Sequence, residues 1–167
     1  MVTSRQIWAQ CLSLAANVGD ALLKRQQTLA TAESCTGGGI GYVITEVAGS
    51  SAWFNGGLIT YTNALKQQWL QVPAEVLASD GAVSQRCVEA MARGACSAAG
   101  SDWAIAVSGV AGPAGGSADK PVGTVWMAIA KGNTVDSCVE QFAGDREAVR
   151  LQTIECVLTR LVKKLNE

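Results

Sequence analysis

With 167 residues, the chain has the length of one domain that can bury roughly two thirds of its unfolded surface. Apolar residues make up 49% and charged residues 16%, which is typical of a compact α/β protein and argues against disorder. Thirteen basic and fourteen acidic side chains give a net charge of -1, so nothing in the charge balance indicates a nucleic-acid or membrane-surface partner.

The first half of the chain alternates between helical and strand patterns. Apolar residues at helical spacing predict an amphipathic helix over about residues 4–25, and a short apolar run predicts a strand over residues 28–33. Thr36 is expected to begin a second helix that runs to about Val47, with three glycines near its start. A second strand is expected over residues 56–62.

Capping residues indicate the helices that follow. Asn63 is predicted to cap a short helix over residues 64–70, because asparagine is a favoured N-cap residue. Pro73 would lie in the first turn of another short helix. Ser84 would cap a longer helix over residues 85–99, which is rich in alanine and cysteine.

The last third of the chain begins with a strand of buried type over residues 102–108. A loop with four glycines follows at residues 109–121, and residues 122–130 and 134–142 then read as a β-hairpin. The final helix is expected to begin near Asp145. The whole order predicts a three-layer α/β/α sandwich with a mixed, mostly parallel sheet, formed by residues 1–167 as a single domain.

The N-terminus and the cysteines indicate the compartment. The first 20 residues lack the continuous apolar core of a signal peptide, and no window is as long as a membrane span, so we expect a cytoplasmic protein. Without histidine or a C-x-x-C pair, the cysteines do not form a zinc-site pattern. Most should be small buried side chains in a reducing compartment, and the one beside Ser34 is the candidate for reactivity; they are Cys11, Cys35, Cys87, Cys96, Cys138 and Cys156.

A glycine cluster, Gly37-Gly38-Gly39-Ile40-Gly41, invites a nucleotide-binding interpretation that its spacing does not support. It fits neither G-x-G-x-x-G nor a P-loop, so ATP or NAD binding is not indicated. A helix N-terminus with exposed amides would suit a phosphate, a carboxylate or a developing oxyanion. Alternatively, the glycines only let this helix pack closely against the sheet.

Ser34 stands at a predicted strand-to-helix junction, a common place for a nucleophile. A serine before a helix is also an ordinary N-cap, and Glu33 is either an active-site acid or a capping carboxylate. Because the chain has no histidine, a catalytic Ser34 needs another base.

Lys66 is a candidate for that base. It would lie in the first turn of its helix, where the helix dipole disfavours an ammonium, and burial would lower its pKa further. The alternative is an ordinary solvated lysine. Tyr61 has a hydroxyl that could relay a proton or bind substrate, or it is a half-buried strand aromatic with its tip in water.

Two further segments could bind a ligand. Ser108 and Gly109 end a predicted buried strand, and ligands usually bind beyond the carboxyl ends of strands in open α/β sheets. Arg146, at the start of the final helix, could hold a phosphate bidentately or pair with Asp145 or Glu147 on the surface.

Several short motifs occur together in a characteristic order. They are Ala32 to Gly38, Gly49-Ser50-Ser51, Gly57 to Asn63 with Lys66, Gly81 to Ser84, Ser108 to Pro113, Lys120 to Val125, and Gly144-Asp145-Arg146. In these motifs the chain resembles the C-terminal domain of competence/damage-inducible protein CinA, the family of the stand-alone nicotinamide-nucleotide amidohydrolases called PncC. The resemblance covers residues 5–162.

This resemblance implies hydrolysis of the carboxamide of nicotinamide mononucleotide (NMN) to nicotinate mononucleotide and ammonia, without metal or cofactor. The family's serine–lysine pair falls on Ser34 and Lys66, and its tyrosine on Tyr61. Many members have threonine where this chain has Ser108, which keeps the hydroxyl. The expected substrate-binding residues, with the last three as candidates for the phosphate, are Thr36, Gly37, Gly38, Ser108, Gly109, Ser50, Ser51 and Arg146.

On this hypothesis neutral Lys66 takes the proton of Ser34, with Tyr61 assisting, and Ser34 attacks the carboxamide carbon. Amides at the start of the glycine-rich helix would hold the oxyanion. The resemblance also implies a homodimer. The alternative is a catalytically silent relative that binds a nucleotide and acts as a regulatory or interaction module.

Overall fold

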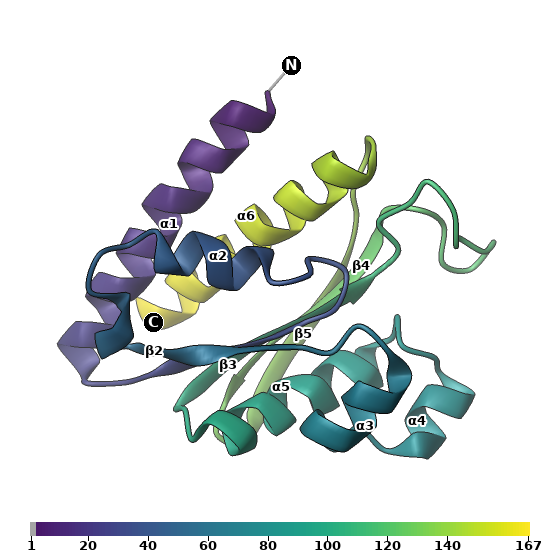
Figure 1. The fold of residues 1–167 in the computed structure, drawn as a ribbon, viewed down its shortest axis with the longest axis horizontal. Helices are drawn as coiled ribbons and strands as arrows, with labels where there is room; N and C mark the ends of the chain where they lie inside the picture. The colour runs from purple at the N-terminus through teal and green to yellow at the C-terminus, as the bar shows by residue number, and fades with distance from the viewer. Residues whose placement is uncertain (1–2) are drawn as a thin grey trace.

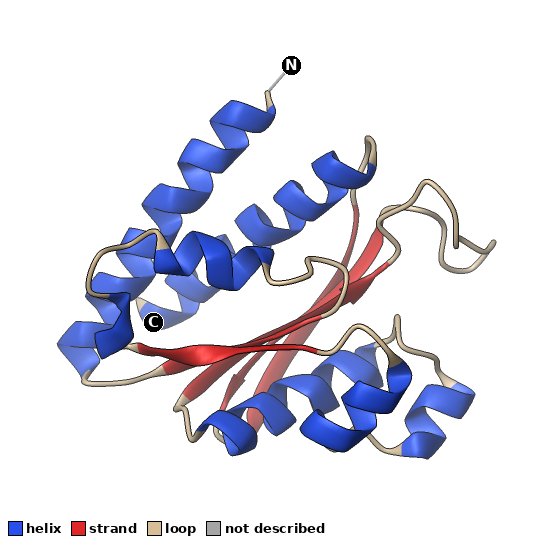
Figure 2. Ribbon diagram, in the orientation of Figure 1, coloured by secondary structure: helices blue, strands red, loops and turns tan. Residues whose placement is uncertain are grey.

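A five-stranded sheet separates two helical layers in the computed structural model, which describes residues 3–167 (Figures 1 and 2). The strands are β1 Leu29–Glu33, β2 Phe54–Ile59, β3 Trp103–Gly109, β4 Thr124–Lys131 and β5 Thr134–Gln141. The helices are α1 Ser4–Arg25, α2 Gly39–Thr45, α3 Asn63–Leu70, α4 Ala74–Ser79, α5 Gln85–Ala99 and α6 Arg146–Leu165, with the short 3-10 helix η1 at Ser50–Ala52. None of the helices in this described part is long and apolar enough to cross a membrane.

The sheet is mixed, with the strand order β2-β1-β3-β4-β5. β1 pairs in parallel with both β2 and β3, whereas the β3–β4 and β4–β5 pairs are antiparallel. The three-layer architecture is confirmed, but the expectation of a mostly parallel sheet is wrong. Parallel neighbours need a crossover connection, usually a helix. The chain supplies such helices only before β3; β4 and β5 are reached through a loop and a hairpin turn.

Alternating residue size in the strands assigns the two faces of the sheet. On β3, Ile105 and Val107 lie in the core beneath α1, α2 and α6, while Ala104 and Ala106 face α5. The alanine face lets α5 approach the sheet closely. On another side, α5 approaches α3 closely at Gly94, where a Cβ would overlap the backbone of Leu70 at the end of α3. The packing of α3 on α5 therefore depends on small residues.

Element boundaries near the site differ from the prediction. The strand expected over residues 56–62 is β2 at Phe54–Ile59, so Tyr61 lies after the strand and is exposed, not a half-buried strand aromatic. The helix expected from Thr36 begins only at Gly39, because Gly37 and Gly38 have left-handed backbones, with φ of 58° and 95°. The helix-capping residue is Thr62, whose side chain accepts a hydrogen bond from the Leu65 N–H at 3.3 Å. Asn63 is therefore the first residue of α3 and not its cap.

Candidate active site

Ser34 lies at the carboxyl edge of the parallel strands, immediately after β1. Its N–H donates to the Val107 carbonyl of β3 at 3.1 Å, which ties the start of the turn to the sheet. The side chain is 8% exposed and lines a cavity of about 310 Å³. This is the sheet edge at which open α/β folds bind their ligands.

Lys66, on α3, is brought to Ser34 from 32 residues away. Its Nζ is a hydrogen-bonding distance of 3.0 Å from the Ser34 Oγ and donates to the Thr60 and Tyr61 carbonyls at 2.7 and 3.3 Å. The residue is only 1% exposed, so the alternative of a solvated helix lysine is wrong. None of the ion pairs found within residues 3–167 includes it. Burial without a carboxylate partner lowers the pKa of Lys66, which favours the neutral amine.

Tyr61 and Arg146 form a second pair at the cavity. The Tyr61 ring is 57% exposed, and its hydroxyl accepts a hydrogen bond from Arg146 Nη2 at 2.9 Å. The other terminal nitrogen, Nη1, donates to the Gly112 carbonyl at 2.8 Å. The surface pairing of Arg146 with Asp145 or Glu147 is absent from the ion pairs of residues 3–167. Arg146 is thus held by neutral groups, so its charge has no carboxylate partner there.

The end of β3 and the loop after it form one wall of the cavity. Ser108 is 1% exposed, and Gly109 packs so closely on β4 that a Cβ would approach the Thr124 carbonyl to 2.7 Å. Residues 110–112 and 114–115 continue this wall. The structure therefore brings together six of the residues expected at the site, Ser34, Tyr61, Lys66, Ser108, Gly109 and Arg146.

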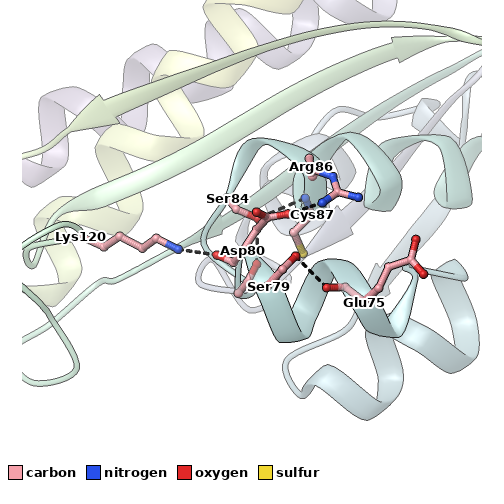
Figure 3. Close-up of polar contacts among 8 residues, drawn as sticks. Glu75, Ser79, Asp80, Ser84, Arg86, Cys87 and Lys120 are labelled. Carbon is pink, nitrogen blue, oxygen red and sulfur yellow. Dashed lines mark hydrogen bonds and ion pairs between the residues drawn. The ribbon is translucent and has the colours of Figure 1, made fainter.

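Ala82 and Val83, in the turn between α4 and α5, also line the cavity. Lys120, from the far end of the glycine-rich loop, donates to the Asp80 carbonyl and so links this loop to the turn after α4 (Figure 3). The Asp80 carboxylate is itself paired with Arg86 at 2.8 Å (Figure 3).

Glu33, beside Ser34, is a capping carboxylate and not an active-site acid. Its side chain is 1% exposed and accepts hydrogen bonds from the N–H groups of Gly38, Ile40 and Gly41, at 3.1, 3.0 and 2.8 Å. These donors lie at the start of α2. The three amides are already engaged, which leaves them unavailable to an oxyanion or phosphate.

The remaining expected ligands lie elsewhere. The Thr36 side chain is fully buried and donates to Glu33 at 2.6 Å, and neither Gly37 nor Gly38 lines the cavity. Ser50 and Ser51 lie in η1, before β2, at the amino-end edge of the parallel strands. Ser34 is at the carboxyl-end edge, so the structure does not bring these two serines to its cavity.

Cys35 is a buried apolar side chain and not an exposed nucleophile. It is 5% exposed, and burial raises the pKa of its thiol to about 11. The thiol is therefore protonated at neutral pH, whereas the thiolate is the reactive form.

Some residues that support the site are not apparent from the sequence patterns. The carbonyl groups of Thr60 and Tyr61 hold Lys66, and no side-chain pattern reveals a backbone acceptor of this kind. Arg150 is another; its Nη2 donates to the Thr36 carbonyl at 2.9 Å. Its only signal in the sequence is its position four residues after Arg146, on the same face of α6.

Comparison with known proteins places this chain in a family. The model of the CinA C-terminal domain matches residues 12–165. The chain belongs to the CinA C-terminal domain family. It is 54% identical over 151 residues to the nicotinamide-nucleotide amidohydrolase PncC of Pseudomonas putida, an alignment covering 90% of this chain and 94% of that protein. With the protein of the same name from Escherichia coli it shares 50% over 157 residues, covering 92% and 93% of the two chains.

Solved structures of the family have the same fold. The competence damage-inducible protein A of Klebsiella pneumoniae superposes with a TM-score of 0.91 at 41% identity, and the match covers 94% of this chain and 98% of that one. The resemblance inferred from the motifs is thus confirmed, both in sequence and in fold.

Proposed function

We propose that this CinA-family chain hydrolyses the carboxamide of NMN to nicotinate mononucleotide and ammonia. Two relatives that are 50 to 54% identical over most of both chains are named nicotinamide-nucleotide amidohydrolases. The observation that carries the proposal is the buried Lys66 amine at 3.0 Å from the Ser34 hydroxyl. Serine with a lysine base is a known way to activate a nucleophile without histidine.

Lys66 is suited to act as the general base. A neutral amine has two N–H bonds and one lone pair, and the Thr60 and Tyr61 carbonyls accept two hydrogen bonds from Nζ. The lone pair can then accept the proton of Ser34. Because the pKa of Lys66 is lowered by burial, the neutral form needed for this step is accessible at lower pH than in an exposed lysine.

In the first half of the reaction, the Ser34 Oγ forms a bond to the carboxamide carbon while its proton moves to Lys66. Lys66 then gives this proton to the amide nitrogen, the C–N bond breaks, and ammonia leaves. In the second half, Lys66 takes a proton from water, the resulting hydroxide attacks the acyl carbon, and the ester bond to Ser34 breaks. The proton returns to Ser34, and nicotinate mononucleotide is released.

The oxyanion of the tetrahedral intermediates needs hydrogen-bond donors near Ser34. Glu33 engages the amides of α2, so these do not serve. The N–H group of Cys35 immediately follows the nucleophile and donates to no other residue within residues 3–167, and Cys35 lines the cavity. We assign the oxyanion to this group, since the amide after a nucleophilic serine has this role in other hydrolases.

Arg146 is the candidate ligand for the phosphate of the nucleotide. It lines the same cavity as Ser34 and has no carboxylate partner within the described residues. A guanidinium binds phosphate oxygens with charge-assisted hydrogen bonds. The Tyr61 hydroxyl accepts a hydrogen bond from Arg146, so we infer that Tyr61 orients this arginine instead of relaying a proton.

Two further proposals concern the protein in the cell. We infer a cytoplasmic enzyme, since its six cysteines are all free thiols, as expected in a reducing compartment. We also propose a homodimer; exposed apolar side chains such as Tyr42, Ile59 and Trp69 could contribute to its interface.

An assay of the purified protein with NMN tests the function. We expect ammonia and nicotinate mononucleotide in equal amounts, measured by an enzyme-coupled ammonia assay and by chromatography. Measurable binding of NMN by calorimetry without release of ammonia would instead favour the alternative of a silent nucleotide-binding module.

A further inference from the structure

The Glu33 carboxylate collects more hydrogen bonds than capping one helix requires. Besides the three α2 amides, it accepts from the hydroxyl of Thr36 at 2.6 Å and from that of Thr31 at 3.3 Å. Five donors thus converge on one buried side chain, and no cation is paired with it among the described residues. Glu33 does not line the cavity, so it cannot contact a substrate there.

These contacts close a ring around Ser34. Glu33 precedes the nucleophile, and Thr36, its hydrogen-bond partner, follows two residues after it. Within the ring, the Gly37 N–H donates to the Ser34 carbonyl at 3.0 Å. The Ser34 hydroxyl has one protein partner within residues 3–167, the Lys66 amine. The direction of Oγ is therefore set by the backbone that Glu33 holds.

A hydrogen bond from α6 also holds this turn. Arg150 reaches from α6 and donates to the Thr36 carbonyl at 2.9 Å. Thr36 is consequently held through its hydroxyl by Glu33 and through its carbonyl by Arg150. The turn that carries the nucleophile is thus clamped between β1 and α6.

We propose that Glu33 is a positioning residue that orients Ser34 toward Lys66 by holding the turn over residues 34–41. This inference rests on the proposed function, because it assigns Ser34 as nucleophile and Lys66 as base. The side chain must accept at both of its oxygens, since backbone N–H groups, which can only donate, face Oε2 and Oε1. A carboxylate meets this requirement and an amide does not.

Glu33→Gln is the sharpest test because it preserves shape. Three donors face Oε2, and the N–H of Gly41 faces Oε1, so the new NH₂ group must oppose at least one donor. We expect kcat to fall by about 100-fold, the loss associated with a misplacement of roughly 1 Å, while KM changes little. Activity should still rise with pH as it does in the wild-type enzyme, since Lys66 remains the base.

A second variant and a control guard against misfolding. Thr36→Val removes the 2.6 Å bond but keeps the carboxylate, so we expect a smaller loss of kcat with KM again preserved. Glu46→Gln makes the same chemical change at an exposed residue just after α2 and should leave kcat unchanged. Circular dichroism at the assay temperature gives the folded fraction of each variant.

Crystal structures give a readout that does not depend on activity. In Glu33→Gln we expect the Ser34 Oγ to Lys66 Nζ distance to exceed hydrogen-bonding range. Failure of wild-type protein to release ammonia would refute the proposed function but leave this distance testable. An unchanged 3.0 Å distance, a near-normal kcat in folded Glu33→Gln, or a loss of kcat that only follows the unfolded fraction would each overturn the positioning role.

Discussion

The Lys66 amine lies 3.0 Å from the Ser34 hydroxyl, inside the protein and in none of the ion pairs within residues 3–167. The lysine approaches from α3 and the serine from the end of β1, two elements that meet at the carboxyl edge of the sheet. This relationship gives a histidine-free chain both a nucleophile and a base. Its consequences can be tested by substitution.

Removing either member of the pair should abolish amide hydrolysis. Ser34→Ala is expected to lower kcat by at least about 10⁴-fold, because it removes the nucleophile. Lys66→Met should lower it by about 10²- to 10⁴-fold, the usual contribution of a general base. Ammonia release from NMN measures both effects.

Matched controls make this result interpretable. Ser51→Ala and Lys163→Met make the same kinds of change at exposed residues away from the cavity and should retain wild-type turnover. Near-normal turnover in Ser34→Ala or in Lys66→Met would refute the assignment of the pair.

The activity should depend on the protonation of Lys66. Burial lowers its pKa below the ordinary lysine value, and only the neutral amine can take the proton of Ser34. We therefore expect kcat/KM to rise with pH through this lowered pKa and then to level off. A pH–rate profile of the wild-type enzyme measures this dependence of kcat/KM on pH. A profile that falls over the same interval would contradict the role of Lys66 as base.

The same lowered pKa has a consequence for stability. At pH values between the folded-state and unfolded-state pKa of Lys66, the unfolded chain binds more protons, so the free energy of unfolding increases with pH. Below both values the full cost of the buried ammonium is present. Lys66→Met removes that cost, so its advantage over wild type should be largest at low pH and shrink as pH rises. Urea unfolding of both proteins across the pH range tests this; an advantage that grows with pH would contradict it.

Arg146 should act on binding of the phosphate and not on the chemical step. Loss of a charge-assisted hydrogen bond in Arg146→Ala is expected to raise KM for NMN by about 10- to 100-fold, with a smaller change in kcat. Tyr61→Phe should have a weaker effect of the same kind, since the hydroxyl contacts Arg146. Steady-state kinetics with NMN give both parameters.

The riboside of nicotinamide provides the comparison for this prediction. It lacks the phosphate, so Arg146→Ala should change its kinetics little. Arg93→Ala, at a surface residue of α5 with one weak ion pair, is the matched control. Equal losses for the two substrates would show that Arg146 does not recognise the phosphate.

Gly94 should be intolerant of any side chain. A Cβ at this position would overlap the Leu70 carbonyl, so Gly94→Ala must push α3 away from α5. We expect a loss of about 1 to 3 kcal/mol in the free energy of unfolding, the usual range for overpacking. Gly41→Ala is the control, because its Cβ would meet nothing closer than 3.6 Å. Urea unfolding should show that Gly94→Ala is less stable than Gly41→Ala. Equal stability of the two variants would contradict the close packing.

Much of the fold follows from local signals in the chain. Helical spacing predicts α1 over residues 4–25, and capping serine and aspartate side chains locate the starts of α5 and α6 at Ser84 and Asp145. Strand patterns do not show pairing direction, so the expected parallel content of the sheet exceeds the observed one. Thr62 is hard to identify as a cap because Asn63 beside it is a favoured N-cap residue.

Local patterns in the chain show which groups are available: a serine after a strand, a lysine in the first turn of a helix, and no histidine. The role of each group depends on the folded arrangement. It buries Lys66 against Ser34, gives the α2 amides to Glu33, and separates Ser50 and Ser51 from the cavity. Local patterns cannot assign these roles, because pKa, hydrogen bonding and solvent access depend on neighbours in space, and the folded sheet brings those neighbours together from distant parts of the chain.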